Sequence, residues 1–130
     1  TKSEENILNR IKGYCPPGKV KVTPPMNLRV LAGVLKKSRI FIGNDSGMMH
    51  LAAMVGTPIV GIFGPGNSKT TGPYMDAKYY EILTKNYSCS PCRQHFFKEC
   101  KPSPHNKPYC LEDITVKNVH DALHRLLKRV

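Results

Sequence analysis

Apolar residues along the chain follow helical spacing in some segments and continuous runs in others. Four segments have the pattern of helices, with apolar side chains three and four positions apart or a capped start: 3–12, 27–38, 46–55 and 115–130. Three short runs are apolar almost throughout, as strands buried on both faces are: 39–43, 58–64 and 79–84. Residues 19–23 alternate and predict one more short strand, which Pro24 and Pro25 would end.

Strands and helices alternate along the chain, which indicates an α/β fold with a parallel sheet flanked by helices. The pattern stops after Lys85, where four cysteines and several prolines follow without periodicity. We therefore expect one Rossmann-like domain over 1–130, made of an α/β core (1–85), a cysteine-rich loop (86–114) and a C-terminal helix (115–130).

Composition adds one constraint, a strong excess of positive charge. The 130 residues include 20 Lys and Arg against 9 Asp and Glu, a net charge of +11. Such a surplus suggests an acidic partner such as a phosphorylated substrate, an anionic lipid or a nucleic acid, or simply a well-solvated surface. No apolar run approaches the roughly 18–20 residues of a membrane span.

Four of the five cysteines lie close together in the sequence, and Cys15 stands apart. The four form the pattern Cys89-x₂-Cys92-x₇-Cys100-x₉-Cys110. Four thiolates suffice for a tetrahedral structural zinc ion. The second pair is widely spaced, however, so free thiols or disulfides remain alternatives, and a catalytic thiol is not expected.

The turn at residues 43–47 is the first candidate for binding chemistry. It follows a predicted strand and opens a predicted helix, with the sequence Gly-Asn-Asp-Ser-Gly. The first N–H groups of a helix lack internal acceptors and carry the positive end of its dipole. Gly43, Gly47 and the hydroxyl of Ser46 would suit a phosphate there. Ordinary helix capping is the alternative explanation.

Two side chains near this turn have open roles. Asp45 would repel a phosphate, so we expect it to cap the helix by accepting N–H bonds or to accept hydroxyl groups of a sugar. His50 shares a helix face with Ser46 and Gly47 and could point back to the turn. A histidine in an apolar helix could equally be a core residue.

A second loop, residues 64–74, follows the next strand and should lie beside the first turn. It offers hydroxyl and ammonium groups for a phosphate or a sugar at Ser68, Lys69, Thr70 and Thr71. A glycine- and proline-rich surface loop without a ligand is the alternative.

Taken together, these motifs resemble glycosyltransferase family 9, the lipopolysaccharide heptosyltransferase family. The resemblance is carried by D-S-G-x-x-H-L-A-A-x-x-G-T-P-x-V-x-x-F-G-P followed by G-P-Y, from Asp45 to Tyr74. The approach M-N-L-x-x-L-A-G-V-L-K-K-S-R-I-F-I-G-N from Met26 to Asn44 also fits, as do C-S-P-C-x₇-C and C-L-E-D-I-T downstream. It covers the chain from about Val20 to Val130.

The resemblance implies the GT-B architecture of two Rossmann-like domains, of which this chain matches the C-terminal, donor-binding half. We then expect the acceptor domain, with the catalytic base, to lie outside this chain, which would be an engineered fragment or a truncated reading frame. No catalytic residue is assigned here, and the chain alone should be inactive. The implied reaction is an inverting transfer of heptose, from ADP-heptose in particular, to the lipopolysaccharide core, with no metal required.

By the same resemblance, Asp45, Ser46, Gly47 and His50 line the donor diphosphate and sugar. Met26 matches a position near the adenine in some relatives, although ordinary core packing would also explain a methionine there. The chain departs from the family at Gly64-Pro65-Gly66, where Gly-Pro-Thr is frequent. A hydroxyl contact would then be missing or supplied nearby, and Ser68 and Lys69 are candidate donor contacts.

The family further implies a cytoplasmic protein that contacts the inner membrane peripherally through its glycolipid acceptor. A small zinc-containing module that binds nucleic acid is the alternative from another class, since it would use the Cys-x₂-Cys pair and the positive charge. The sequence shows no recognition helix or stacking-aromatic motif for it, so we expect no nucleic-acid partner.

Overall fold

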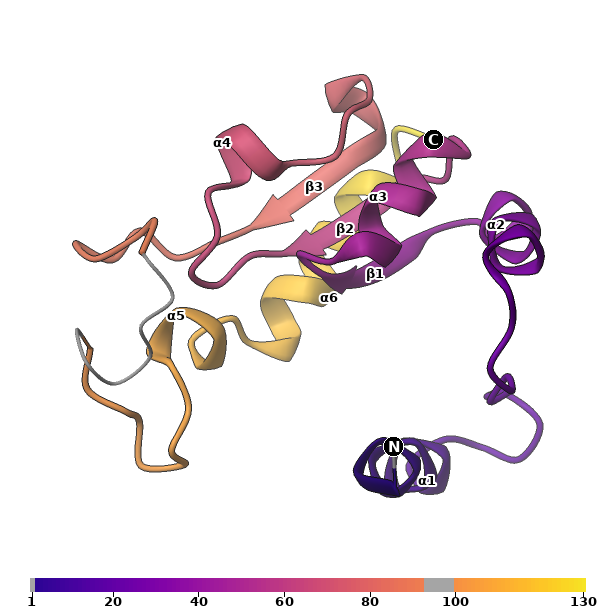
Figure 1. The fold of residues 1–130 in the computed structure, drawn as a ribbon, viewed down its shortest axis with the longest axis horizontal. Coiled ribbons are helices and arrows are strands. Elements are labelled where there is room, and N and C mark those ends of the chain that lie inside the picture. The colour runs from indigo at the N-terminus through magenta and orange to yellow at the C-terminus, as the bar shows by residue number, and fades with distance from the viewer. Residues whose placement is uncertain (1, 93–99) are drawn as a thin grey trace.

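The computed structural model describes residues 2–92 and 100–130 and contains a three-stranded parallel sheet in the order β1-β2-β3. β1 (Phe41–Asn44) pairs with β2 (Ile59–Ile62), and β2 pairs with β3 (Tyr80–Leu83). Phe41 lies opposite Ile59, and Ile59 lies opposite Tyr80. The expected α/β class, with a parallel sheet flanked by helices, is confirmed (Figure 1).

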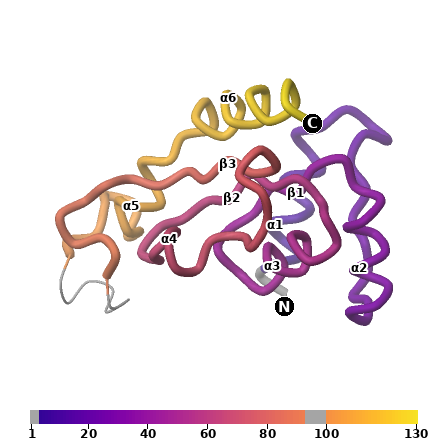
Figure 2. The backbone as a smooth tube through the Cα atoms, turned by 90° about the horizontal axis from the view of Figure 1, so that it is seen from above, coloured from indigo at the N-terminus to yellow at the C-terminus, as the bar shows by residue number. Residues whose placement is uncertain are grey.

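Helices cover both faces of this sheet, so the fold has three layers (Figure 2). α2 (Leu28–Lys37) and α3 (Gly47–Met54) lie on one side, and α6 (Val116–Leu127) lies on the other. Successive residues of a strand point to opposite faces. Ile59 therefore joins the α3 side of the core, whereas Val60 packs against Ala122 and Leu126 of α6.

Local sequence signals explain where these helices begin. Asn27 caps α2, because its side chain accepts the Val30 N–H at 3.0 Å. Thr115 and Asn118 form a reciprocal capping box at the start of α6. The far end of α6 is held to β3 by Glu81, which accepts hydrogen bonds from Arg125 and Arg129.

The remaining elements are short. α4 (Ser68–Thr71) interrupts the second loop, and the 3₁₀ turn η1 (Ala77–Tyr79) precedes β3. α5 (Tyr109–Glu112) closes the cysteine-rich segment, in which Pro102 and Pro108 form an isolated antiparallel bridge. None of the helices in the described ranges combines the length and the apolar character needed to cross a membrane.

The N-terminal part differs from the sequence prediction. α1 (Lys2–Gly13) forms as expected, but it lies apart from the sheet (Figure 1). The predicted strand at 19–23 is wrong, because these residues have no strand assignment and pair with no strand in the described chain. An alternating pattern forms a strand only where another strand offers hydrogen bonds, and here most of the residues are exposed.

Candidate functional site

The candidate site lies where β1 and β2 end. Asn44 and Ile62 are the last residues of these strands and are paired with each other, so both following loops leave the same edge of the sheet. The Asp45 N–H donates to the Ile62 carbonyl at 3.1 Å, which extends the strand pairing into the turn. This carboxyl edge is where parallel sheets bind ligands.

The start of α3 presents hydrogen-bond donors without partners. The N-cap Ser46 is extended (φ −160°) and its side chain makes no capping bond. Within the described chain, no acceptor is recorded for the N–H groups of Gly47 and Met48. A Cβ added at Gly47 would meet nothing within 4 Å. The helix start is therefore open to a ligand that accepts hydrogen bonds, as an anion does.

Asp45 joins the two loops instead of capping the helix. Its Oδ2 accepts a hydrogen bond from Thr71 Oγ1 at 3.4 Å, and a Cβ on Gly66 would lie 2.4 Å from the same oxygen. None of the N–H bonds expected for a cap is recorded for this carboxylate in the described chain, so the capping prediction is wrong. The carboxylate contacts the second loop instead, at Thr71 and Gly66.

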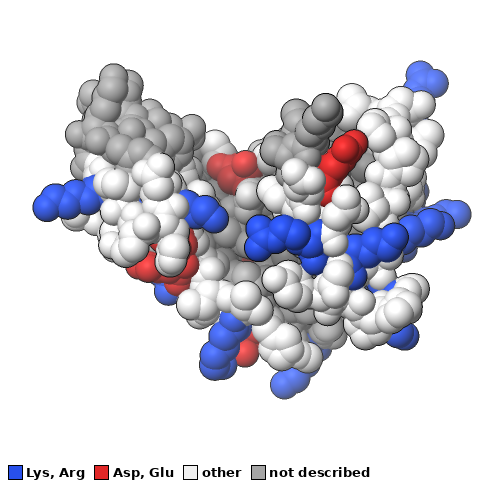
Figure 3. Space-filling view, turned by 90° about the horizontal axis from the view of Figure 1, so that it is seen from below, with Lys and Arg blue, Asp and Glu red and all other residues white. Residues whose placement is uncertain are grey.

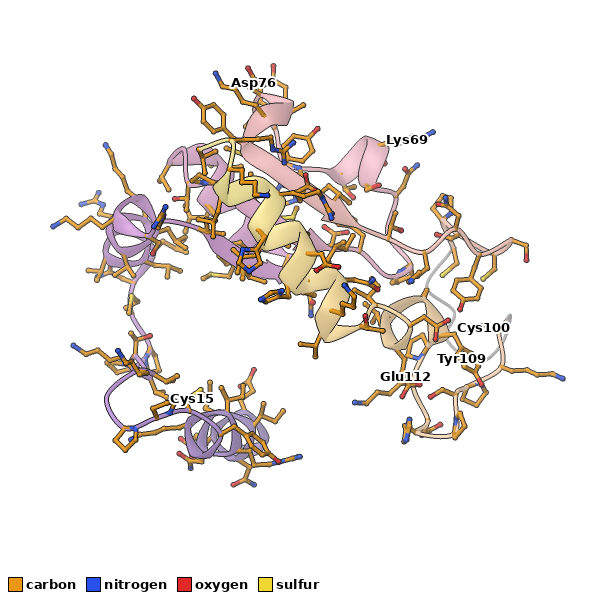
Figure 4. All side chains as sticks on the ribbon, turned by 180° about the vertical axis from the view of Figure 1, so that it is seen from behind. Cys15, Lys69, Asp76, Cys100, Tyr109 and Glu112 are labelled. Atoms are coloured by element: carbon orange, nitrogen blue, oxygen red, sulfur yellow. The ribbon has the colours of Figure 1, made fainter. Side chains whose placement is uncertain are left out.

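The second loop is organised by Asn67, the N-cap residue of α4. Its Oδ1 accepts the Lys69 N–H at 3.1 Å, and its carbonyl accepts the hydroxyls of Thr70 (3.2 Å) and Thr71 (3.0 Å). Ser68 is half-buried and Lys69 is exposed. The Lys69 side chain projects from α4 away from the body of the molecule (Figure 4).

His50 is exposed and lies in the first turn of α3, where its N–H donates to the Ser46 carbonyl at 3.4 Å. The alternative that it is a core residue is therefore wrong. Met49, one position earlier, is buried with none of its surface exposed, and Ala52 and Ala53 are the other buried residues of α3. His50 is thus accessible on the outer side of the helix, close in sequence and space to Ser46 and Gly47.

Met26 is not brought to this edge. It is half-buried and lines a separate groove of about 840 Å³ between α1 and α2, together with Ile7, Leu8, Val22 and Leu31 among others. A position near a nucleobase therefore stays a prediction for this residue.

The four clustered cysteines come together in space. Cys89, Cys92, Cys100 and Cys110 line one pocket of about 180 Å³, which we call the cysteine pocket. None of the five cysteines, all of them among the described residues, forms a disulfide, and Cys15 lies at the opposite end of the molecule from Cys100 (Figure 4). Burial raises the pKa of the Cys110 thiol, and its three cysteine neighbours raise it further.

Two histidines near the cysteines in the sequence, His95 and His105, are further candidate metal ligands. His105 is not among the residues that line the cysteine pocket. It bonds to Glu112, and hydrogen bonds from the Ser103 hydroxyl and then from His105 lower the pKa of the Glu112 carboxyl despite partial desolvation. His95 lies outside the described residues.

Sequence reasoning missed two contacts across the site. It did not find the Thr71–Asp45 bond, nor the bond from the Cys92 N–H to the Pro65 carbonyl at 3.1 Å, which places the cysteine-rich segment against the second loop. Both contacts join residues 26 or more positions apart, so local sequence patterns do not reveal them. The glycine at position 66 is a sequence feature consistent with the close approach, because a Cβ there would lie 2.4 Å from Asp45 Oδ2.

Comparison with known proteins gives the family. The family described as "Glycosyltransferase family 9 (heptosyltransferase)" matches residues 1–101. The chain is 31% identical to lipooligosaccharide heptosyltransferase 2 of Campylobacter jejuni over 98% of its own length and 39% of that protein. It is 32% identical to lipopolysaccharide heptosyltransferase 1 of Pseudomonas aeruginosa over 72% of its own length and 25% of that protein.

No solved structure matches the chain. The chain spans well under half the length of these two relatives. With the family match extending over most of its residues, the chain belongs to glycosyltransferase family 9.

Proposed function

We propose that this chain binds the nucleotide-sugar donor, ADP-heptose in particular, of a glycosyltransferase that transfers heptose to the lipopolysaccharide core. The observation that carries the proposal is the open start of α3 at the carboxyl edge of the sheet, built from the residues Asp45 to His50 of the family motif. The names of the relatives supply the reaction class, since each is a heptosyltransferase.

The donor diphosphate would lie against the N–H groups of Gly47 and Met48. Negative charge grows on this diphosphate as the bond to the sugar breaks, and preorganised donors stabilise the charge without having to reorient. The dipole of α3 adds to the same effect. In this proposal the chain contributes to the reaction by stabilising the leaving group, and the transfer proceeds with inversion.

The neighbouring side chains would complete donor binding. The Ser46 hydroxyl and the accessible His50 ring are near enough to the open N–H groups to bond to the diphosphate or the sugar. Ser68 and Lys69 would act from the second loop, with the Lys69 ammonium approaching from solvent. Asp45 would connect the two loops through its hydrogen bond from Thr71.

The acceptor and the catalytic base belong to a part of the protein beyond these residues in this proposal. No side chain beside the open N–H groups is a free carboxylate, since Asp45 is engaged by Thr71 in the described chain. Residues 1–130 would then act as the donor-binding domain of a two-domain enzyme. The chain covers 39% of the Campylobacter jejuni relative, which leaves room for a second domain of similar size in such a protein.

The positive charge fits a phosphorylated glycolipid acceptor at the cytoplasmic face of the inner membrane. Lys and Arg side chains lie at several places on the face in Figure 3, with acidic side chains between some of them. We propose peripheral attraction to anionic headgroups and no nucleic-acid partner, because the described helices include none with a recognition motif.

Titration of the chain with ADP, in wild-type form and as Gly47→Val, tests this proposal. The valine side chain would occupy the space that is open in front of Gly47, so we expect the fold to persist and ADP affinity to fall at least about tenfold. Blocking even one charge-assisted hydrogen bond costs about 1.5–3 kcal/mol. The matched control is Gly33→Val on α2, where a Cβ also meets nothing within 4 Å.

Equal ADP affinity in the two valine variants and the wild type would refute the phosphate assignment. A parallel titration with short duplex DNA tests the alternative that the chain is a module that binds nucleic acid. Saturable, salt-sensitive DNA binding without ADP binding would overturn the donor-domain proposal in favour of a nucleic-acid module.

A further inference from the structure

The segment between β3 and α6 holds its shape with very little buried side chain. Of its described residues, only Ser103 is buried. The Ser103 hydroxyl accepts the N–H groups of His105 (3.2 Å) and Lys107 (3.3 Å), and this closes a tight turn. Tyr87 bonds to Asp113 and so connects the two ends of the segment. A segment without a core of its own usually needs a cross-link or a metal ion.

The cysteine pocket lies where such a link would act. Two of its four thiols, Cys89 and Cys92, come from the stretch that follows β3. Cys100 comes from the stretch that leads to α5, and Cys110 comes from α5 itself. A bond among them would therefore tie β3, the loop and α5 together. The Cys92 N–H also donates to the Pro65 carbonyl, so the cysteine-rich segment contacts the second loop of the candidate site.

We propose that the cysteine pocket binds one zinc ion through the sulfur atoms of Cys89, Cys92, Cys100 and Cys110. Zinc prefers four sulfur or nitrogen ligands in a tetrahedron, at about 2.3 Å from each sulfur. The Cys-x₂-Cys pair supplies adjacent ligands, and the other two thiols reach the pocket from across the segment. His105 is engaged by Glu112, so the set is made of thiols alone.

The charge of the filled site suits its surroundings. Four thiolates around Zn²⁺ carry a net charge of −2 by simple addition, and Lys101, which also lines the pocket, would partly neutralise it. Each neutral thiol releases its proton to solvent as its sulfur bonds to the ion, so no electron transfer is involved. Cys15, at the other end of the molecule, takes no part.

The thiols must still close around the ion. Within residues 2–92 and 100–130, no three ligand side chains stand in a metal-binding arrangement. Small metal sites commonly form their final geometry only as the ion binds, because binding and local folding are coupled. We therefore infer a structural zinc that orders the segment and, through the Cys92–Pro65 bond, supports the second loop.

Metal analysis of the intact 130-residue chain, purified with a thiol reductant and without chelators, tests the inference. We expect one zinc per chain by elemental analysis. Cobalt substituted for zinc should give the intense visible bands and thiolate charge-transfer bands of tetrahedral sulfur coordination. Both measurements use the unaltered chain, so they do not depend on whether any variant folds.

Ligand identity is tested with single Cys→Ser variants. Cys89→Ser and Cys110→Ser should weaken zinc binding by more than the roughly 10–100-fold that loss of an outer partner costs. Cys15→Ser, the matched control, should keep full zinc content. A zinc-free wild type without cobalt bands would overturn the proposal. Disulfides among the four cysteines, found by alkylation and mass spectrometry of anaerobically purified chain, would also overturn it. So would a loss of zinc from Cys15→Ser equal to that from Cys89→Ser and Cys110→Ser.

Discussion

The Asp45 carboxylate accepts a hydrogen bond from the Thr71 hydroxyl at 3.4 Å and so connects the loops that follow β1 and β2. The carboxylate lies against the Gly66 backbone, where a Cβ would come within 2.4 Å of Oδ2. The contact therefore engages the carboxylate that precedes the open N–H groups of α3 in the sequence.

This contact predicts different effects for two substitutions of Asp45. Asp45→Asn keeps an acceptor oxygen for Thr71 and should leave ADP affinity within about twofold of the wild type. Asp45→Ala removes the connection and should weaken ADP binding about three- to tenfold, the equivalent of a hydrogen bond worth roughly 0.5–1.5 kcal/mol. Calorimetric titration measures both.

Asp121→Asn is the control for the change of net charge, because Asp121 is on α6, which covers the other face of the sheet. Unchanged ADP affinity in Asp45→Ala would show that the connection between the loops does not shape the site. Much tighter binding in Asp45→Asn would show that the carboxylate repels the ligand.

The packing of α6 against the sheet should account for much of the stability. Leu126 has none of its surface exposed and lies against Val60 and Ala122. We expect Leu126→Ala to lower the free energy of unfolding by about 2–5 kcal/mol, because it removes buried methyl groups and leaves a cavity. Urea unfolding followed by circular dichroism measures the loss.

Val116→Ala, at the exposed start of the same helix, is the matched control for Leu126→Ala. It should change the free energy of unfolding by less than about 0.5 kcal/mol. A similar loss in both variants would mean that packing on the sheet does not account for the effect, because alanine is the better helix former at both positions.

A buried hydroxyl connects α2 to the loop before β2. Thr57 Oγ1 donates to the Leu35 carbonyl at 2.7 Å, and the Thr57 side chain is almost fully buried. Thr57→Val keeps the shape and removes the bond, while the carbonyl retains the Ser38 N–H at 2.8 Å. We therefore expect a loss of about 0.5–1.5 kcal/mol in urea unfolding.

Thr70→Val tests whether that loss comes from the buried bond, because the Thr70 hydroxyl also donates to a carbonyl but is exposed. It should cost less than Thr57→Val, since water replaces an exposed hydrogen bond readily. An equal cost would point to the loss of a hydroxyl in general.

Alkaline pH should lower the stability of the fold by ionising Tyr87. Its hydrogen bond to Asp113, with desolvation and the nearby carboxylate charge, raises the pKa of Tyr87 to about 12. The phenol of an unfolded chain ionises near 10. The folded pKa is the higher one, so the stabilisation is complete below about pH 10 and is lost as pH rises through about 12.

An ultraviolet titration of phenolate should show this late step among the six tyrosines. Tyr87→Phe should remove it, and Tyr74→Phe, at a ring that is 99% exposed, should leave it in place. A late step that persists in Tyr87→Phe would show that another tyrosine is responsible.

Local patterns predicted most of the fold. The strands β1, β2 and β3 and the helices α2, α3 and α6 form within a few residues of the expected ranges, because apolar periodicity and capping residues act over short distances. Residues 19–23 show the limit of this approach. Their alternation is a correct strand pattern, yet no neighbouring strand in the described chain pairs with it.

The candidate site likewise has features that local sequence predicts and features that it does not predict. Local order along the chain is enough to place Ser46, Gly47 and His50 at the start of a helix after a strand. The bond from Thr71 to Asp45, the exposure of His50 and the shared pocket of four cysteines depend instead on tertiary contacts. Such contacts join residues distant in sequence, and their geometry follows from how the sheet brings its loops together.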